Sequence, residues 1–299
     1  MTTGLGAHST AADVLSGIDL AGHTAVVTGG YSGIGREATL ALAAAGAHVI
    51  VPARRPEVAR QALRGSPIEI RPMDLADLAS VEAFAAGFRR DRAALDIVIA
   101  SAAVMACPET RVGPGWEAQF AINHLGHYAL VAHLWPELKA AAAARVVVVG
   151  SGRSPEDRMR WDDIHFGRRY DKWAAYGQSK LANVLFAHHL DKLGVRAFSA
   201  SPGWVLSPLQ RHLGRTEMIE AGWIDAEGRP MPGLFRSAAQ GAATPVWAAT
   251  SPDAEPYGGA YCRDCAATET YPTDGPEGER LWELSAALTG LDPRQSTTR

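Results

Sequence analysis

The chain has 299 residues, of which 47% are hydrophobic and 20% charged, with 29 basic and 32 acidic side chains. This composition is typical of a folded protein with a buried core and excludes a disordered chain. The absence of a long basic run predicts no nucleic-acid partner, three cysteines exclude a disulfide-stapled scaffold, and no apolar run approaches the about 18 residues of a membrane span. We expect no secretory signal and therefore a cytoplasmic location, without a membrane partner.

Short strand-like runs alternate along the chain with longer stretches of helical periodicity. We expect strands at 24–28, 48–51, 68–71, 96–100, 145–149 and 195–200, and helices at about 34–45, 77–90, 116–138 and 172–193. The runs at 24–28, 96–100 and 145–149 are continuously apolar, which is typical of parallel strands buried on both faces. The alternation predicts an α/β fold with a doubly wound sheet.

The domain organisation is expected to be simple. No Gly/Ser-rich linker or internal repeat divides the sequence, so we expect one domain at 21–299 after an N-terminal appendage at 1–20. Two irregular segments, an Arg-rich one at 152–171 and a Pro/Gly/Arg-rich one at 206–235, interrupt the alternation. Loops of this length are usually functional, so we expect both to shape a substrate pocket.

A glycine-rich turn joins the first expected strand to the first expected helix. Its residues are Thr28, Gly29, Gly30, Tyr31, Ser32, Gly33, Ile34 and Gly35. Glycines allow close approach of the backbone, and a helix N-terminus offers free N–H groups, so this position suits the pyrophosphate of a dinucleotide. The alternative is an ordinary tight turn, which the flanking strand and helix disfavour.

The end of the second expected strand carries a cofactor-selecting signal. A dehydrogenase that prefers NAD usually has an acidic residue there, whereas this chain has Arg54 and Arg55. A guanidinium can bind a 2′-phosphate through bidentate hydrogen bonds, so we predict NADP(H) in preference to NAD(H). Two solvated arginines at a helix start are the alternative. Asp74 and Leu75, after the third strand, are placed to contact the adenine.

Tyr176 and Lys180 are four residues apart and therefore share a helix face. A nearby ammonium lowers the pKa of a phenol, which could then act as general acid or base on a carbonyl or alcohol oxygen. Ser151 follows the buried run at 145–149, at the strand end where α/β sheets bind ligands, and could donate a hydrogen bond to the substrate oxygen.

Other polar and aromatic residues lie at the same edge of the expected sheet. Asn123 lies inside a helical stretch, where it either packs or holds a relay water. The main chain after the sixth strand could bind a nicotinamide carboxamide, through Pro202, Gly203, Val205 and Ser207. Trp161, Trp173, Trp204 and Trp223 flank or lie within the irregular segments. We expect Trp173 and Trp204, with Arg153, to line an apolar substrate pocket.

These motifs carry a family resemblance. In chain order they are TGGYSGIG (28–35), Asp74, Asn123, Ser151, YGQSK (176–180) and PGWVLS (202–207). In this order and spacing they make about residues 20–290 similar to the classical short-chain dehydrogenase/reductase family. VIVPARR, FAINHLGHY, GGAYCRDC, RLWELSAALTG and the insertion before Tyr176 resemble its retinol dehydrogenase and WW-domain oxidoreductase branch.

The resemblance implies a three-layer Rossmann fold with a mostly parallel, seven-stranded sheet and transfer of the 4-pro-S hydride of a nicotinamide. It places the family's Asn-Ser-Tyr-Lys tetrad on Asn123, Ser151, Tyr176 and Lys180. Tyr176 would be the acid/base and Ser151 would hold the carbonyl oxygen. Lys180 would lower the tyrosine's pKa and bind the nicotinamide ribose, and Asn123 would position a relay water.

The chain also departs from the family pattern. Where Asn-Asn-Ala-Gly is usual it has Ala100-Ser101-Ala102-Ala103, so Ser101 replaces the Asn that stabilises the sheet, and Ser101 and Ala102 border the cofactor. Ser207 stands where Thr is commoner. We identify no membrane anchor or WW domain of that branch, so retinoid substrates are not carried over. A homodimer or homotetramer is the expected assembly, with a monomer as the alternative.

Cysteine and histidine pairs raise the question of a metal. Cys262 and Cys265 form a C-x-x-C pair, but a structural zinc site needs four ligands and no second pair is present. His124, His127 and His133 share one helical stretch, where a satisfied surface or interface role is favoured over ligation. We therefore predict no metal.

The expected function is NADP(H)-dependent interconversion of a carbonyl (ketone or aldehyde) and an alcohol, on a small apolar or aromatic molecule. Two alternatives stay open. One is a cofactor-binding regulatory protein with little catalysis, for which the altered Ser101 segment is the motive. The other is the family's chemistry directed at a C=C or C=N bond.

Overall fold

The computed structural model describes residues 4–151, 157–268 and 275–295. Its centre is an eight-stranded sheet with the order β10-β9-β8-β7-β4-β1-β2-β3. These strands are β1 Thr24–Thr28, β2 His48–Ala53, β3 Glu69–Pro72, β4 Ile97–Ala100, β7 Arg145–Val149, β8 Ala197–Ser201, β9 Tyr261–Arg263 and β10 Ala266–Thr268. Neighbours from β9 to β3 pair in parallel, and β10 pairs antiparallel with β9. The predicted doubly wound sheet is confirmed.

The count of strands differs from the seven that the resemblance implies. Seven strands are parallel, and the hairpin β9–β10 adds an eighth at the edge. Each strand of this hairpin has three residues, too few to give a periodic signal in sequence. A further small hairpin, β5 Arg111–Val112 with β6 Trp116–Glu117, lies outside the main sheet.

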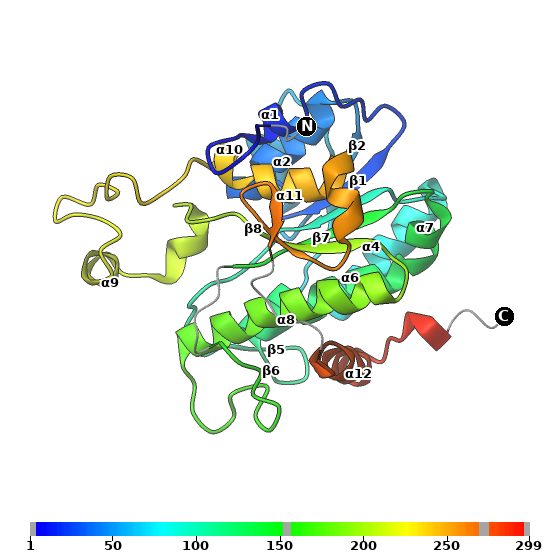
Figure 1. Ribbon diagram of the computed structural model, residues 1–299. Coiled ribbons are helices and arrows are strands. Elements are labelled where there is room, and N and C mark those ends of the chain that lie inside the picture. The colour runs from blue at the N-terminus through cyan, green and yellow to red at the C-terminus, as the bar shows by residue number, and fades with distance from the viewer. Residues whose placement is uncertain (1–3, 152–156, 269–274, 296–299) are drawn as a thin grey trace.

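Helices cover both faces of the sheet (Figure 1). On one face lie α1 Ala11–Val14, α2 Gly33–Ala44, α10 Ala238–Gly241 and α11 Ala243–Thr250. On the other lie α4 Leu78–Asp91, α6 Gly126–His133, α7 Trp135–Ala140 and α8 Lys172–Lys192, with α12 Glu277–Thr289 packed against α8. The remaining elements are α3 Pro56–Ala62, α5 Ala118–Phe120, the π turn η1 Ala121–Leu125, η2 Pro208–His212, α9 Arg215–Glu220, η3 Pro252–Tyr257 and η4 Pro293–Gln295.

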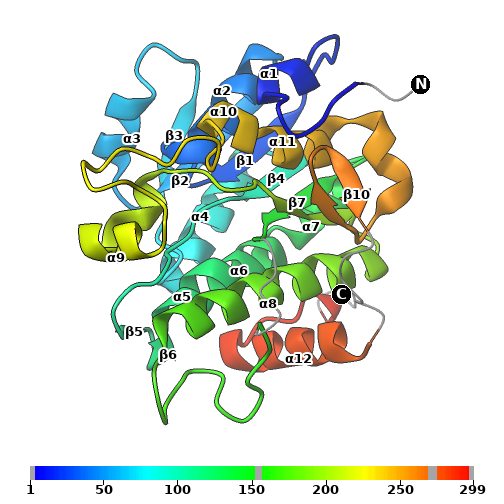
Figure 2. The ribbon, with the colours of Figure 1, turned by 60° about the vertical axis from the view of Figure 1, so that its left-hand side comes forward.

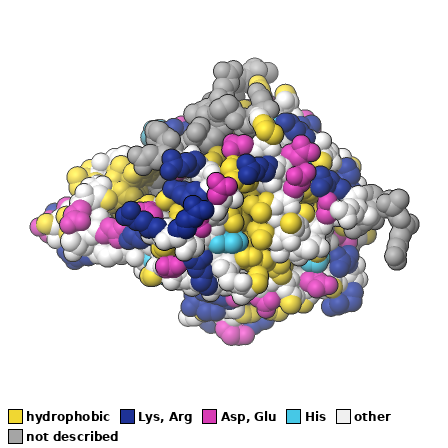
Figure 3. Space-filling view, turned by 90° about the horizontal axis from the view of Figure 1, so that it is seen from below, with side chains coloured by type: hydrophobic (Ala, Val, Ile, Leu, Met, Phe, Trp, Pro, Cys, Tyr) yellow, Lys and Arg dark blue, Asp and Glu magenta, His cyan; other side chains and the backbone are white. Residues whose placement is uncertain are grey.

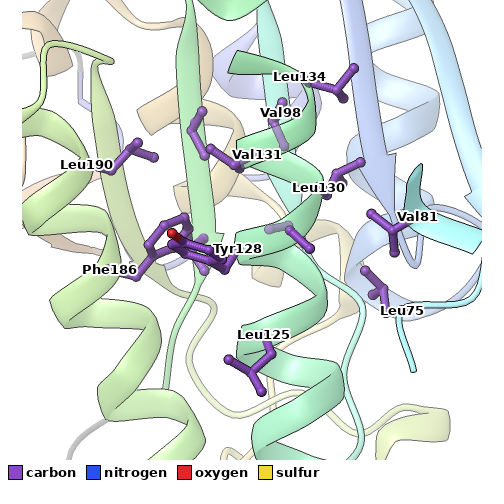
Figure 4. Packing of buried hydrophobic residues seen from close by; sticks show 14 of the residues in the cluster. Leu75, Val81, Val98, Leu125, Tyr128, Leu130, Val131, Leu134, Phe186 and Leu190 are labelled. Carbon is purple, nitrogen blue, oxygen red and sulfur yellow. The ribbon is translucent and has the colours of Figure 1, made fainter. Parts of the chain in front are cut away.

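Two apolar cores separate these layers. The larger one joins the sheet to α4, α6 and α8, where Tyr128 and Phe186 pack together with ring centroids 5.9 Å apart (Figure 4). Trp282 of α12 closes this core, 5.0 Å from the ring of Tyr128. Each such buried side chain stabilises the fold by about 1.5–3 kcal/mol. Helix α8 is therefore held from both the sheet and α12.

The second core includes residues from the expected N-terminal appendage. Ala11, Val14, Leu15 and Leu20 are buried, and α1 packs against α11. Thr10 caps α1 by accepting the N–H of Asp13. The described residues before β1 thus contribute to the core rather than lying apart from it.

The segment 206–235 leaves the body as a lobe that carries η2 and α9 (Figures 1 and 2). Viewed from below, Lys and Arg side chains gather where this lobe meets the rest of the molecule (Figure 3). No helix among the described residues has the length and hydropathy required to cross a bilayer.

Candidate active site

The carboxyl ends of the central strands surround one cavity of about 1500 Å³. This volume exceeds the roughly 300–1,000 Å³ of a single small-molecule site. β1 lies between β2 and β4, so the chain order reverses here, which is where open α/β sheets bind ligands. Every described residue that we predicted for the site lines this cavity except Gly30, Gly35 and Asn123. Arg153 lies outside the described residues.

The glycine-rich turn forms one wall of the cavity. Gly29 has φ +66°, and a Cβ there would lie 2.9 Å from Cα of Ala102. Gly33 has φ +52° and begins α2, where a Cβ would lie 3.3 Å from Cβ of Ser207. These close approaches require glycine and bring bare backbone to the cavity wall. The turn and the helix N-terminus beside it suit a pyrophosphate, so the chain fits a dinucleotide.

Arg54 and Arg55 lie at the end of β2 and the start of α3. Both are exposed and line the cavity, and neither pairs with a carboxylate among the described residues. The turn after β3 is fixed by Asp74, whose carboxylate accepts the N–H of Ala76 at 3.0 Å. This end of the cavity is therefore basic and open to an anion.

Tyr176 and Lys180 project from one face of α8, as their spacing predicts. The Tyr176 hydroxyl hydrogen-bonds to Ser151. The Lys180 ammonium donates to the carbonyl oxygen of Val149 at 3.0 Å and lies 5.6 Å from the centroid of the Tyr176 ring. Asp171 begins the helix by accepting the N–H groups of Trp173 and Ala174. A hydroxyl pair and an ammonium thus share the cavity wall beside the glycine turn.

Burial governs the proton affinity of this pair. It raises the pKa of Tyr176 above its ordinary value, an effect that the Ser151 hydrogen bond opposes and the charge of Asp157 reinforces. Burial also lowers the pKa of Lys180 to about 8. Burial of the phenol therefore dominates the pKa of Tyr176, and a lowering of this pKa by Lys180 stays a prediction. Tyr176 is a protonated phenol at neutral pH.

Asn123 lies within the π turn, away from the cavity wall. Its Oδ1 accepts the N–H of Val104 at 2.9 Å, and its Nδ2 donates to the Val104 carbonyl oxygen and to Ser179 Oγ, both at 2.9 Å. The side chain is fully buried. It therefore joins the loop after β4 to α8, which fits the packing alternative, and a relay water held at this position stays a prediction.

The altered segment after β4 is held by its main chain. The N–H groups of Ser101 and Ala102 both donate to Thr28 Oγ1 at 3.0 Å. Gln119 accepts the N–H of Ala106 at 2.8 Å further along. Because these contacts use backbone groups, the position of the segment does not depend on an Asn side chain at 101.

An aromatic cluster occupies the outer part of the cavity. Trp223 lies at its centre, with ring-centroid distances of 6.1 Å to Trp173, 5.5 Å to Trp204 and 6.3 Å to Phe235. All four line the cavity, and Trp204 is 53% exposed. Trp161 lies elsewhere, beneath the guanidinium of Arg280. The cluster offers apolar ring faces to a ligand.

The family model for short chain dehydrogenases matches residues 23–218, which include the turn, Ser151, Tyr176 and Lys180. This chain belongs to the short-chain dehydrogenase family. It is 40% identical over 295 residues to a Streptomyces lividans protein named "Probable oxidoreductase", covering 90% of this chain and 98% of that protein. It is 35% identical over 287 residues to human retinol dehydrogenase 12, covering 92% and 88%. The chain is an oxidoreductase of this family, consistent with the retinol dehydrogenase branch.

Solved structures of other proteins share the fold. An uncharacterized Mycobacterium paratuberculosis protein superposes with a TM-score of 0.74 at 30% identity, covering 95% of this chain and 98% of its own. The Pseudomonas aeruginosa RhlG/NADP active-site complex gives a TM-score of 0.61 at 25% identity, covering 82% and 95%.

The cavity of this short-chain dehydrogenase includes residues that the sequence did not single out, and three of them bear on its chemistry. They are Asp157, Arg211 and Phe235. All three lie in or beside the irregular segments, where no periodicity assigns a direction to a side chain. The composition of those segments marked them as pocket-forming, but it could not select individual residues. Among the described residues, no cluster of three or more His, Cys, Asp or Glu could hold a metal.

Proposed function

We propose that this protein is an NADP(H)-dependent oxidoreductase that interconverts a carbonyl, ketone or aldehyde, and an alcohol. The observation that carries the proposal is the hydrogen-bonded Tyr176–Ser151 pair beside Lys180, in a cavity that also contains the glycine-rich turn. The names of relatives agree with it, since one is a retinol dehydrogenase.

NADP(H) would occupy the cavity from Arg54 and Arg55 to Tyr176, and when bound it supplies the hydride. The turn at 28–35 would hold the pyrophosphate, and the two arginines would hold the 2′-phosphate. The loop at Ser101 and Ala102 and the segment from Pro202 to Ser207 would border the nicotinamide. NADP appears in the titles of two similar structures, which supports the choice.

The chain's own residues supply the proton and the polarisation. The Ser151 and Tyr176 hydroxyls would both hydrogen-bond to the substrate's carbonyl oxygen. As the carbonyl carbon gains a hydride, negative charge develops on that oxygen, and Tyr176 donates its phenolic proton to give the alcohol. Lys180 then stabilises the phenolate that Tyr176 becomes. The raised pKa of Tyr176 keeps the phenol protonated, which is the form that carbonyl reduction requires.

The substrate class follows from the aromatic cluster. Trp173, Trp204, Trp223 and Phe235 would enclose a bulky apolar or aromatic group next to the reacting carbonyl. Flat aromatic partners gain about 0.5–1.5 kcal/mol per ring pair beyond the area they bury.

The test is reduction of a panel of aromatic and aliphatic aldehydes and ketones with NADPH, followed by loss of nicotinamide absorbance and isolation of the alcohol. Tyr176→Phe should lower kcat by at least about 100-fold with the fold intact. Tyr257→Phe removes a phenol that is 51% exposed and should match the wild type. Full activity of Tyr176→Phe would refute the mechanism, and NADPH binding without turnover of any panel member would favour a regulatory protein.

A further inference from the structure

The segment 206–235 carries a further arginine to the cavity. Arg211 lies in η2 and lines the same cavity as Arg54 and Arg55. Its Nη1 donates to the Pro208 carbonyl oxygen at 3.0 Å. Its other N–H groups have no partner among the residues that the structure describes.

Contacts of the preceding residues, beginning at the glycine-rich turn, fix the position of Arg211. Ser207 packs against Gly33 and caps η2 by accepting the N–H of Leu209 at 3.2 Å. Gln210 accepts the N–H of Ser207 at 2.8 Å and donates to the Val205 carbonyl oxygen at 2.9 Å. The next residue, Arg211, is therefore presented by a capped turn that rests on the start of α2.

The charge of Arg211 lies near those of Arg54 and Arg55. Burial lowers the pKa of Arg211, and the positive charges of Arg54 and Arg55 lower it further. None of the three makes an ion pair with a carboxylate among the described residues. Arg229 of the same lobe, in contrast, pairs with Asp225 at 2.7 Å. Guanidinium groups that repel one another in this way cost free energy unless an anion joins them.

We propose that Arg211 is a phosphate ligand of the dinucleotide, reaching it from the lobe on the side opposite the glycine turn. The inference rests on the proposed function, since it requires a bound dinucleotide. The turn would offer backbone N–H groups to the phosphates, and Arg211 would offer a planar guanidinium. Because Trp223 and Phe235 lie in the same lobe, this contact would also link cofactor binding to the aromatic pocket.

The experiment is a fluorescence titration of wild-type protein, Arg211→Gln, Arg211→Lys and Arg229→Gln with NADPH and, separately, with NADH. Arg211→Gln should raise the Kd at least about tenfold, and Arg211→Lys should recover part of the loss. Arg229→Gln removes an equal charge from a side chain that is 71% exposed and outside the cavity lining, so it should match the wild type.

Comparison of NADPH with NADH shows which phosphate Arg211 contacts. An equal loss for NADPH and NADH places Arg211 on the diphosphate, and a loss for NADPH alone places it on the 2′-phosphate. Either result supports the proposal. Wild-type affinity of Arg211→Gln for both nucleotides would overturn it and leave the proposed function standing. A wild-type protein that binds neither nucleotide would overturn both.

Discussion

The hydroxyl of Thr28 lies 2.8 Å from Nε2 of His127, joining the end of β1 to the buried face of α6. Thr28 Oγ1 already accepts two N–H groups, from Ser101 and Ala102. Its own proton must therefore go to Nε2, which leaves His127 neutral with its proton on Nδ1. Nδ1 then donates to the carbonyl oxygen of Asn123 at 3.0 Å. The Thr28 hydroxyl thus connects the glycine-rich turn to the π turn.

Thr28→Val should lose this connection while keeping the volume of the side chain. The Ala102 N–H and one ring nitrogen would lose their partner, at about 1–3 kcal/mol for each buried group left unpaired, whereas the Ser101 N–H keeps the Ile99 carbonyl oxygen. We expect a lower free energy of unfolding in urea and a weaker affinity for NADPH, with both restored in Thr28→Ser. Equal behaviour of the Val and Ser variants would show that the hydroxyl has no such role.

Two buried histidines predict a loss of stability in acid. Burial lowers the pKa of His124 to about 3 and that of His127 to about 4, from an ordinary 6.5. As pH falls below 6.5 the unfolded chain takes up these protons first, so stability is lost down to the folded pKa values. The slope approaches about 1.4 kcal/mol per pH unit for each histidine.

The measurement is urea unfolding of the wild type and His124→Gln at several pH values between 7 and 4.5. The variant should show a shallower loss, because one titrating group is gone. His23→Gln alters an exposed histidine and should keep the wild-type slope. Parallel curves for all three proteins would contradict the assignment of His124 as a neutral buried group.

The lowered pKa of Lys180 predicts that activity falls at alkaline pH. Burial lowers its pKa to about 8, so the ammonium loses its proton as pH rises through that value and no longer stabilises a Tyr176 phenolate. We expect kcat/KM for carbonyl reduction to fall above about pH 8. In Lys180→Arg the residual activity should lack this fall, because arginine stays charged. A wild-type profile that is flat to pH 10 would remove Lys180 from the mechanism.

The cofactor preference is tested at Arg54. Arg54→Asp should lower the ratio of NADPH to NADH affinity at least about tenfold, since the loss of one charge-assisted hydrogen bond costs about 1.5–3 kcal/mol. Arg64→Asp makes the same change at an exposed position outside the cavity lining. If both variants keep the wild-type ratio, the selector lies elsewhere.

The aromatic pocket is tested at Trp223, which touches the other three rings of the cluster. Trp223→Ala should raise KM for bulky aromatic carbonyls about fivefold or more and leave small aliphatic aldehydes nearly unaffected, because only a large substrate reaches the cluster. Trp161→Ala removes an indole outside the cavity lining as the control. An equal change in KM for large and small substrates would place the substrate elsewhere.

The elements that local sequence determines were predictable. The apolar runs matched β1 and β7 residue for residue, and the helix at 172–193 ends one residue beyond α8. The helix expected at 116–138 is divided into α5, the π turn, α6 and α7, and nothing in its periodicity marks those breaks. Site residues on regular elements could be selected one by one, whereas those on the irregular segments could not.

What escaped prediction depends on contacts between distant parts of the chain. The bond between Thr28 and His127 joins residues 99 positions apart. The pKa of Tyr176 is set by burial under several elements rather than by its spacing from Lys180. The role that we propose for Arg211 depends on the contact of Ser207 with Gly33. Such effects follow from packing, which a single sequence does not display.

The central claim is hydride transfer from the cofactor to a carbonyl carbon with Tyr176 as the proton donor. The most direct measurement is reduction of an aromatic ketone by the wild type with NADPH that carries deuterium at the 4-pro-S position, followed by mass spectrometry of both products. The account predicts deuterium on the carbinol carbon and none in the oxidised nucleotide. Deuterium retained by the nucleotide, or an unlabelled alcohol, would contradict it.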